Sequence, residues 1–100
     1  LNSADINSWI LLSAIVDDEY QEVAQRFNIT PAGAARDELL KQANTKMDET
    51  IILYARIVAL SDGKPEAKQI NEQMRQSLEQ YYKYRHKNLD GLNELINKYK

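Results

Sequence analysis

The scarcity of glycine and proline constrains the fold of this chain more than any other feature of its sequence. Its 100 residues include three glycines and two prolines. A β-sandwich or barrel needs many turns, and glycine and proline supply the backbone conformations of most turns. The chain therefore has room for only a few long elements. Its length fits one domain over residues 1–100.

Apolar residues recur three or four positions apart in three long segments, which is the spacing of one helix face. Over 3–27 the face comprises Ile6, Trp9, Ser13, Val16, Tyr20, Val23 and Phe27. Up to residue 61, a second comprises Leu40, Ala43, Met47, Ile51, Tyr54, Val58 and Ser61. Over 65–87 a third comprises Ala67, Ile70, Met74, Leu78 and Tyr81. We predict three long helices.

Short boundaries separate these helices. In 28–31, Thr30 is expected to cap the second helix and Pro31 to occupy its first position. Residues 62–65, which hold Gly63, form the clearest turn. Residues 88–90 precede a short fourth helix. Because short links make neighbouring helices antiparallel, we predict an all-α, antiparallel up-down bundle of three long helices plus a short C-terminal helix.

Two details of these helices stay open. The first helix can be capped by Asn2, Ser3 or Asp5, whose side chains accept from free backbone amides. The second helix carries Asn44 and Thr45 near its middle, and both are poor helix formers. A break at 44–45 is the main alternative to a continuous helix.

Composition excludes several functional classes. There is no cysteine, and one histidine cannot supply a zincin motif or the paired Glu-x-x-His motifs of a di-metal bundle. No glycine-rich phosphate loop and no run of about 18 apolar residues is present. We therefore expect no metal, no cofactor, no transmembrane segment and no enzymatic activity. The net charge of −2 also disfavours a nucleic-acid partner.

The one histidine, His86, leaves a small-ligand site as an alternative. A lone imidazole can act as a general base. However, no serine or cysteine is visibly placed beside it, and a cation near the end of a helix is favoured by the helix dipole in any case. A site near His86 therefore ranks behind a purely structural role for this residue.

Residues 23–39 resemble a helix-turn-helix corner. Ala24 lies in the first helix, Ile29 ends a tight turn, and Thr30 opens the second helix. Nucleic-acid binding through Thr30 and Arg36 is the alternative that this resemblance implies. The segment departs from the motif at Asp37, where an apolar residue is expected, and its acidic surroundings would repel phosphate.

The strongest hypothesis starts from a second apolar strip on the first helix. Ala4, Leu11 and Ile15 point away from the main stripe, so they need cover from another element. Residues 52, 55 and 59 form a similar strip on the second helix, and Arg56 stands alone among them. Either the fourth helix covers one strip or a partner does. Exposed apolar patches on small domains mark contacts with partners.

Aromatic and basic side chains at 81–87 suit the rim of such a contact. Tyr81 is expected to face inward, with Tyr82, Tyr84 and Arg85 beside it. The sequence thus predicts a non-enzymatic module that binds a protein partner, or itself as a homodimer, chiefly through Leu11 and Ile15.

The chain begins with Leu1 rather than methionine, so it is expected to be a processed form, a trimmed piece or a fragment of a longer protein. Its many Asn and Gln residues, together with this start, favour an exported bacterial protein, periplasmic or on the surface, over a cytoplasmic one.

Overall fold

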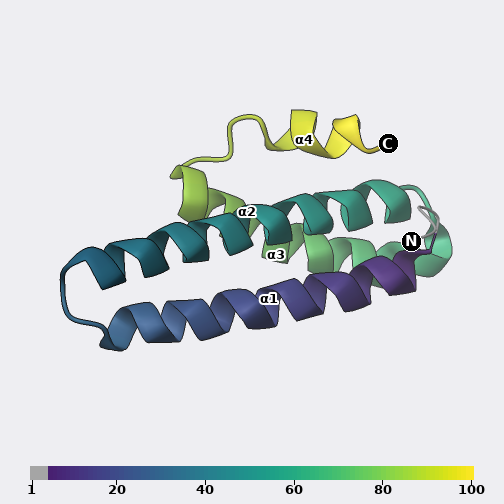
Figure 1. Ribbon diagram of the computed structural model, residues 1–100. Coiled ribbons are helices and arrows are strands. Elements are labelled where there is room, and N and C mark those ends of the chain that lie inside the picture. Colours follow the sequence, from purple (N-terminus) through teal and green to yellow (C-terminus); the bar gives the residue numbers. More distant parts are fainter. Residues whose placement is uncertain (1–4) are drawn as a thin grey trace.

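The computed structural model describes residues 5–100, and in this range the predicted all-α class and the four predicted helices are confirmed (Figure 1). The helices are α1 (Ile6–Ile29), α2 (Ala34–Ser61), α3 (Lys68–His86) and α4 (Leu92–Lys98). A short 3-10 helix, η1 (Pro65–Ala67), leads into α3. Figure 1 shows α1, α2 and α3 lying alongside one another, with α4 on the side of α2 away from α1.

Asp5 caps the beginning of α1. Its carboxylate accepts a hydrogen bond from the backbone N–H of Ser8 at 3.2 Å and another from the Ser8 hydroxyl. These two bonds lower the pKa of Asp5. Of the predicted caps, Asp5 is confirmed, while Asn2 and Ser3 lie outside the described residues, as does Ala4.

The connection between α1 and α2 differs from the prediction. Thr30 ends α1 instead of capping α2: its hydroxyl donates to the backbone carbonyl of Arg26 at 2.6 Å. α2 begins at Ala34, after Gly33, so Pro31 lies in the loop. A threonine hydroxyl can bond the carbonyl four residues back as well as a forward amide, and the backward bond is the one formed here.

α2 is continuous through residues 44–45, so the break considered above does not occur. Threonine hydroxyl groups, which could compete with the helical hydrogen bonds, instead donate to the backbone carbonyl four residues earlier in the helix. Thr45 donates to the carbonyl of Lys41 at 3.1 Å and Thr50 to that of Lys46 at 2.8 Å. The polar residues in the middle of α2 therefore leave its backbone ladder intact.

α2 is the helix against which each of the other three packs. Eleven of its 28 residues are buried, whereas α1, α3 and α4 contribute two each. Ile57 and Val58 of α2 and Leu78 of α3 are fully enclosed. The hydrophobic core is thus arranged around one helix.

α4 covers the second apolar strip of α2. Leu92 and Ile96 of α4 belong to the same buried cluster as Ala55 and Ala59 of α2. Tyr82, near the end of α3, fixes the connecting loop by donating its hydroxyl to the backbone carbonyl of Asp90 at 2.5 Å. Two of the three residues of this strip are therefore covered from within the chain, while Ile52 remains 38% exposed.

Glycine is required in that loop. Gly91 has φ +85°, a conformation that side-chain-bearing residues rarely adopt. A Cβ at this position would lie 2.9 Å from the hydroxyl oxygen of Tyr82. The loop therefore passes too close to the Tyr82 ring for a larger residue.

Candidate interaction surface

Leu11 and Ile15 lie on the outer face of α1. Four residues apart, they share one side of the helix, and they point away from the buried Ser13 and Val16. Leu11 is 64% exposed and Ile15 is 51% exposed. Within residues 5–100, therefore, no element covers this pair as α4 covers the strip on α2.

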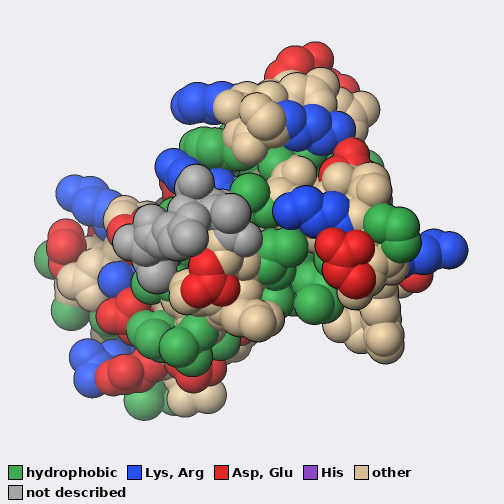
Figure 2. Space-filling model, turned by 90° about the vertical axis from the view of Figure 1, so that its right-hand side faces the viewer, with side chains coloured by type: hydrophobic (Ala, Val, Ile, Leu, Met, Phe, Trp, Pro, Cys, Tyr) green, Lys and Arg blue, Asp and Glu red, His purple; other side chains and the backbone are tan. Residues whose placement is uncertain are grey.

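Acidic side chains continue this face toward the end of α1. Asp18 and Glu22 follow Ile15 at positions that share its side of the helix. Glu22 forms an exposed ion pair with Arg26 at 2.7 Å, while Asp18 is exposed. Figure 2 views the molecule from the end that carries both termini and shows hydrophobic side chains among acidic ones at the lower left, over α1. The outer face of α1 is thus apolar at first and acidic further on.

Tyr82 is a core residue, not a rim residue. It is 9% exposed, because the loop before α4 returns over it. Its neighbour Arg85 donates to the carboxylate of Asp48 at 3.0 Å, an ion pair that joins α3 to α2. Of the three α3 residues predicted for the surface, Tyr84 alone is strongly exposed.

Tyr84 does not join the pair on α1. It lines a hollow of about 160 Å³ between α1 and α2, with Tyr20, Phe27 and Leu40 among its neighbours. Tyr20 and Phe27 belong to the inward stripe of α1, opposite to Leu11 and Ile15. The structure therefore separates the predicted contact residues into two groups.

Both residues of the proposed nucleic-acid corner make local contacts. Arg36 donates to the backbone carbonyl of Phe27 at 3.3 Å, and its guanidinium carbon lies 3.9 Å from the centre of the Phe27 ring. Thr30 is bonded to α1, as described above. In addition, α1 and α2 lie alongside each other in Figure 1, whereas the helices of a helix-turn-helix cross at about 90–120°.

A groove does exist beside His86. It has a volume of about 440 Å³ and is lined by Asp48, Ile51, Ile52, Tyr82, His86, Gly91 and Leu95. The imidazole is exposed and its ring centre lies 4.5 Å from that of Tyr82. Asp48 already accepts from Arg85, and the lining offers no hydroxyl or thiol nucleophile other than the Tyr82 phenol, which is bonded to the loop.

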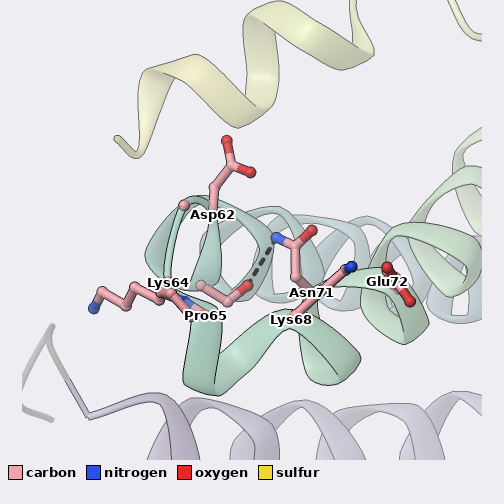
Figure 3. Close-up of a pocket in the computed structure, with 8 residues that line it drawn as sticks. Asp62, Lys64, Pro65, Lys68, Asn71 and Glu72 are labelled. Atoms are coloured by element: carbon pink, nitrogen blue, oxygen red, sulfur yellow. Dashed lines mark hydrogen bonds between the residues drawn. The ribbon is translucent and has the colours of Figure 1, made fainter.

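A second hollow, of about 430 Å³, lies at the corner between α2 and α3 (Figure 3). In its lining, the Asn71 amide donates to the Ser61 hydroxyl at 3.0 Å and to the backbone carbonyl of Val58 at 3.1 Å. A dashed line in Figure 3 marks the hydrogen bond of the Asn71 side chain. These hydrogen bonds hold α2 and α3 together at this corner.

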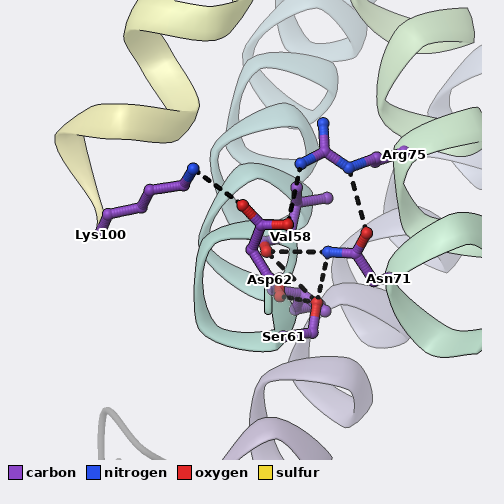
Figure 4. Close-up of polar contacts among 7 residues, drawn as sticks. Val58, Ser61, Asp62, Asn71, Arg75 and Lys100 are labelled. Atoms are coloured by element: carbon purple, nitrogen blue, oxygen red, sulfur yellow. Dashed lines mark hydrogen bonds and ion pairs between the residues drawn. The ribbon is translucent and has the colours of Figure 1, made fainter. Parts of the chain in front are cut away.

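The network extends from this corner to the end of the chain (Figure 4). Arg75 donates to Asn71 at 3.1 Å and to Asp62 at 3.3 Å, and Lys100 forms an ion pair with Asp62 at 2.8 Å. The hydrogen bond and charge of Lys100, followed by Arg75, lower the pKa of Asp62. The segment after α4 is thereby tied to the α2–α3 corner.

A tyrosine cluster joins α1, α2 and α3, and its polar partners were not anticipated from the sequence. The ring centre of Tyr81 lies 5.9 Å from that of Tyr20 and 5.6 Å from that of Tyr54. The Tyr81 hydroxyl donates to Asp17 and accepts from Gln21 at 3.3 Å. The sequence predicted that each of these tyrosines faces the core. Nothing in the spacing of the residues indicated that Asp17 of α1 would contact α3.

Stability is expected to fall above pH 10 because of this cluster. Burial, and to a smaller extent Asp17, raises the pKa of Tyr54 to about 12 from an ordinary value of 10. Between these values the unfolded chain releases its proton while the folded chain keeps it, so the unfolded state is favoured as pH rises. Two pKa units correspond to a loss of about 2–3 kcal/mol. Urea unfolding at pH 9–12 should show this loss, and Tyr54→Phe should reduce it; an unchanged pH dependence would contradict the assignment.

In the part of the chain that the structure describes, no group of three or more His, Asp or Glu side chains could hold a metal ion. None of the helices there combines the length and apolar character needed to cross a membrane. The chain matches no model of a protein family, and comparison with the curated proteins and with the solved structures found no match.

Proposed function

We propose that this chain is an antiparallel up-down helical bundle that acts as a non-enzymatic interaction module and binds a protein partner through the outer face of α1. This proposal rests on the solvent exposure of Leu11 and Ile15. The short connections support the bundle, since residues 30–33 and 62–64 leave little room for anything but a reversal of the chain.

Energetics indicate what the partner must supply. Burying a leucine or isoleucine side chain contributes about 1.5–3 kcal/mol, and about a third of Leu11 and half of Ile15 are already buried here. Two such side chains alone cannot offset the cost of association, which is several kcal/mol. The partner must therefore also cover neighbouring parts of α1.

Charge favours a different protein over a second copy. A partner helix that extends along α1 would meet Asp18 and Glu22 beyond the apolar pair. In a homodimer whose two α1 helices pack in parallel through their outer faces, these carboxylates would repel those of the second copy. Basic side chains of another protein would instead complement them. We therefore expect an apolar anchor flanked by lysine or arginine, and a homodimer is the alternative.

The test is Ile15→Asp, with Leu89→Asp as the matched control. Leu89 is a similarly large apolar residue, 45% exposed, and it lies in the loop between α3 and α4, outside α1. Ile15→Asp should keep the melting temperature but weaken partner binding by a hundredfold or more, since a buried unpaired carboxylate is costly. Cross-linking in the source cells would identify the partner, and sedimentation velocity would measure self-association. If folded Ile15→Asp kept every contact, the proposal would fail.

A small-ligand role has one observation in its favour, the groove beside His86. A nucleic-acid role has none of this kind, because Arg36 is engaged with Phe27 and the chain has a net charge of −2. We therefore keep the groove as the second candidate.

A further inference from the structure

Arg56 lies where α1, α2 and α4 meet. It is the one charged residue in the apolar segment 51–60 of α2. Its guanidinium carbon lies 5.1 Å from the centre of the Trp9 ring on α1 and 4.3 Å from that of Tyr99, which follows α4. Both distances allow a cation–π interaction. Such contacts stabilise the charge but leave the five N–H donors of the guanidinium without acceptors.

The other four arginines have acceptors within residues 5–100. These pairs are Arg26 with Glu22, Arg36 with the Phe27 carbonyl, Arg75 with Asn71 and Asp62, and Arg85 with Asp48. For Arg56 the described residues provide no hydrogen bond and no ion pair, although the residue is partly buried. A partly buried guanidinium without an acceptor is unusual, because desolvation of a charge must be compensated.

A second unpaired donor lies in the same place. The indole Nε1 of Trp9 is buried, and it has no hydrogen-bond partner. Buried polar groups almost always have a partner, so an exception calls for a specific explanation. Trp9 and Arg56 also line one small cavity, of about 50 Å³, together with Leu60 and Tyr99.

We propose that this cavity binds a carboxylate group. A carboxylate offers two acceptor oxygens and one negative charge, which match the paired N–H donors and the positive charge of the guanidinium. The cavity, of about 50 Å³, is several times larger than the roughly 10–15 Å³ that one water needs, so it has room for a carboxylate group. Arg56 excludes cations. This site is separate from the Leu11–Ile15 face, and it can exist whether or not that face binds a partner.

The indole N–H of Trp9 can report on binding to this cavity. Trp9 is the only tryptophan, so its indole N–H gives a single, separate peak in a ¹H–¹⁵N correlation spectrum. We expect sodium acetate to shift this peak saturably, with half-saturation on the order of 10 mM. Sodium chloride at the same ionic strength should not. Arg56→Lys should weaken the response about tenfold, because lysine loses the planar pair of donors; Arg26→Lys, at an exposed ion pair, is the matched control.

Two further ligands distinguish a free carboxylate from the side chain of another polypeptide. If N-acetylglutamate amide shifts the peak and the glutamine analogue does not, the site accepts acidic side chains; if acetate alone acts, it accepts small free carboxylates. Equal shifts with acetate and chloride would overturn the proposal, and so would an unchanged response in folded Arg56→Lys. Should that variant not fold, the comparison of acetate with chloride on the unaltered chain decides the question.

Discussion

Replacing Ile57 with alanine is expected to lower the free energy of unfolding by about 3–4 kcal/mol. Ile57 is completely enclosed near the end of α2. Truncation removes buried methyl and methylene groups and leaves a cavity that closely packed neighbours cannot fill, and such changes cost about 2–5 kcal/mol. Because small domains are stable by only about 5–15 kcal/mol, this single change should remove a large part of the total.

Ile52→Ala provides the matched control for Ile57→Ala. Both substitutions remove the same atoms from the same helix, but Ile52 is 38% exposed. Its loss should cost about 1 kcal/mol, because less apolar area returns to water and no closed cavity forms. Urea denaturation followed by circular dichroism would measure both. Equal losses would mean that α2 is rotated from the orientation described here.

Ile96→Asp is expected to release α4 from the rest of the molecule, at a cost of about 3 kcal/mol or more. Ile96 is 3% exposed in the cluster beneath α4, where a carboxylate would have no partner. A helix of seven residues is not stable by itself in water, so α4 should unfold once it loses this contact. Ala55 and Ala59 of α2 would then be exposed.

Hydrogen exchange would measure the release of α4. In Ile96→Asp the amides of 92–98 should exchange much faster, while those of α1 and of the middle of α2 stay protected. Asn97→Asp adds the same charge at the exposed neighbouring position and should leave exchange nearly unchanged. Protection of α4 at its original level in Ile96→Asp would show that Ile96 does not hold the helix in place.

Periodicity was sufficient to predict the helices, because each long helix buries one face and its apolar residues repeat accordingly. Periodicity failed where a residue can take either of two local roles equally well. Thr30 can end one helix or begin the next, and the sequence contains both possibilities. Tyr81 and Tyr82 both adjoin Leu78 on α3, and only the return of the loop before α4 buries Tyr82. That return is a long-range event without a local signal.

The same limit applies to the candidate sites. The exposed position of Leu11 and Ile15 followed from their place opposite the main stripe of α1. The isolation of Arg56 was visible as one charge in an apolar run. Its aromatic neighbours were not, because Trp9 and Tyr99 lie 47 and 43 positions away in the sequence and meet Arg56 only after the helices have packed.

The central place of α2 has a consequence for the order in which the molecule assembles. α1 and α2 are neighbours in sequence, joined by residues 30–33, so the first large contact closes a short loop at small entropic cost. α3 can then add to a surface that already exists, and α4 docks last onto the opposite side of the same helix. A chain leaving the ribosome would therefore hold its core helix half covered until residues 92–98 emerge, which makes the docking of α4 the step that closes the core.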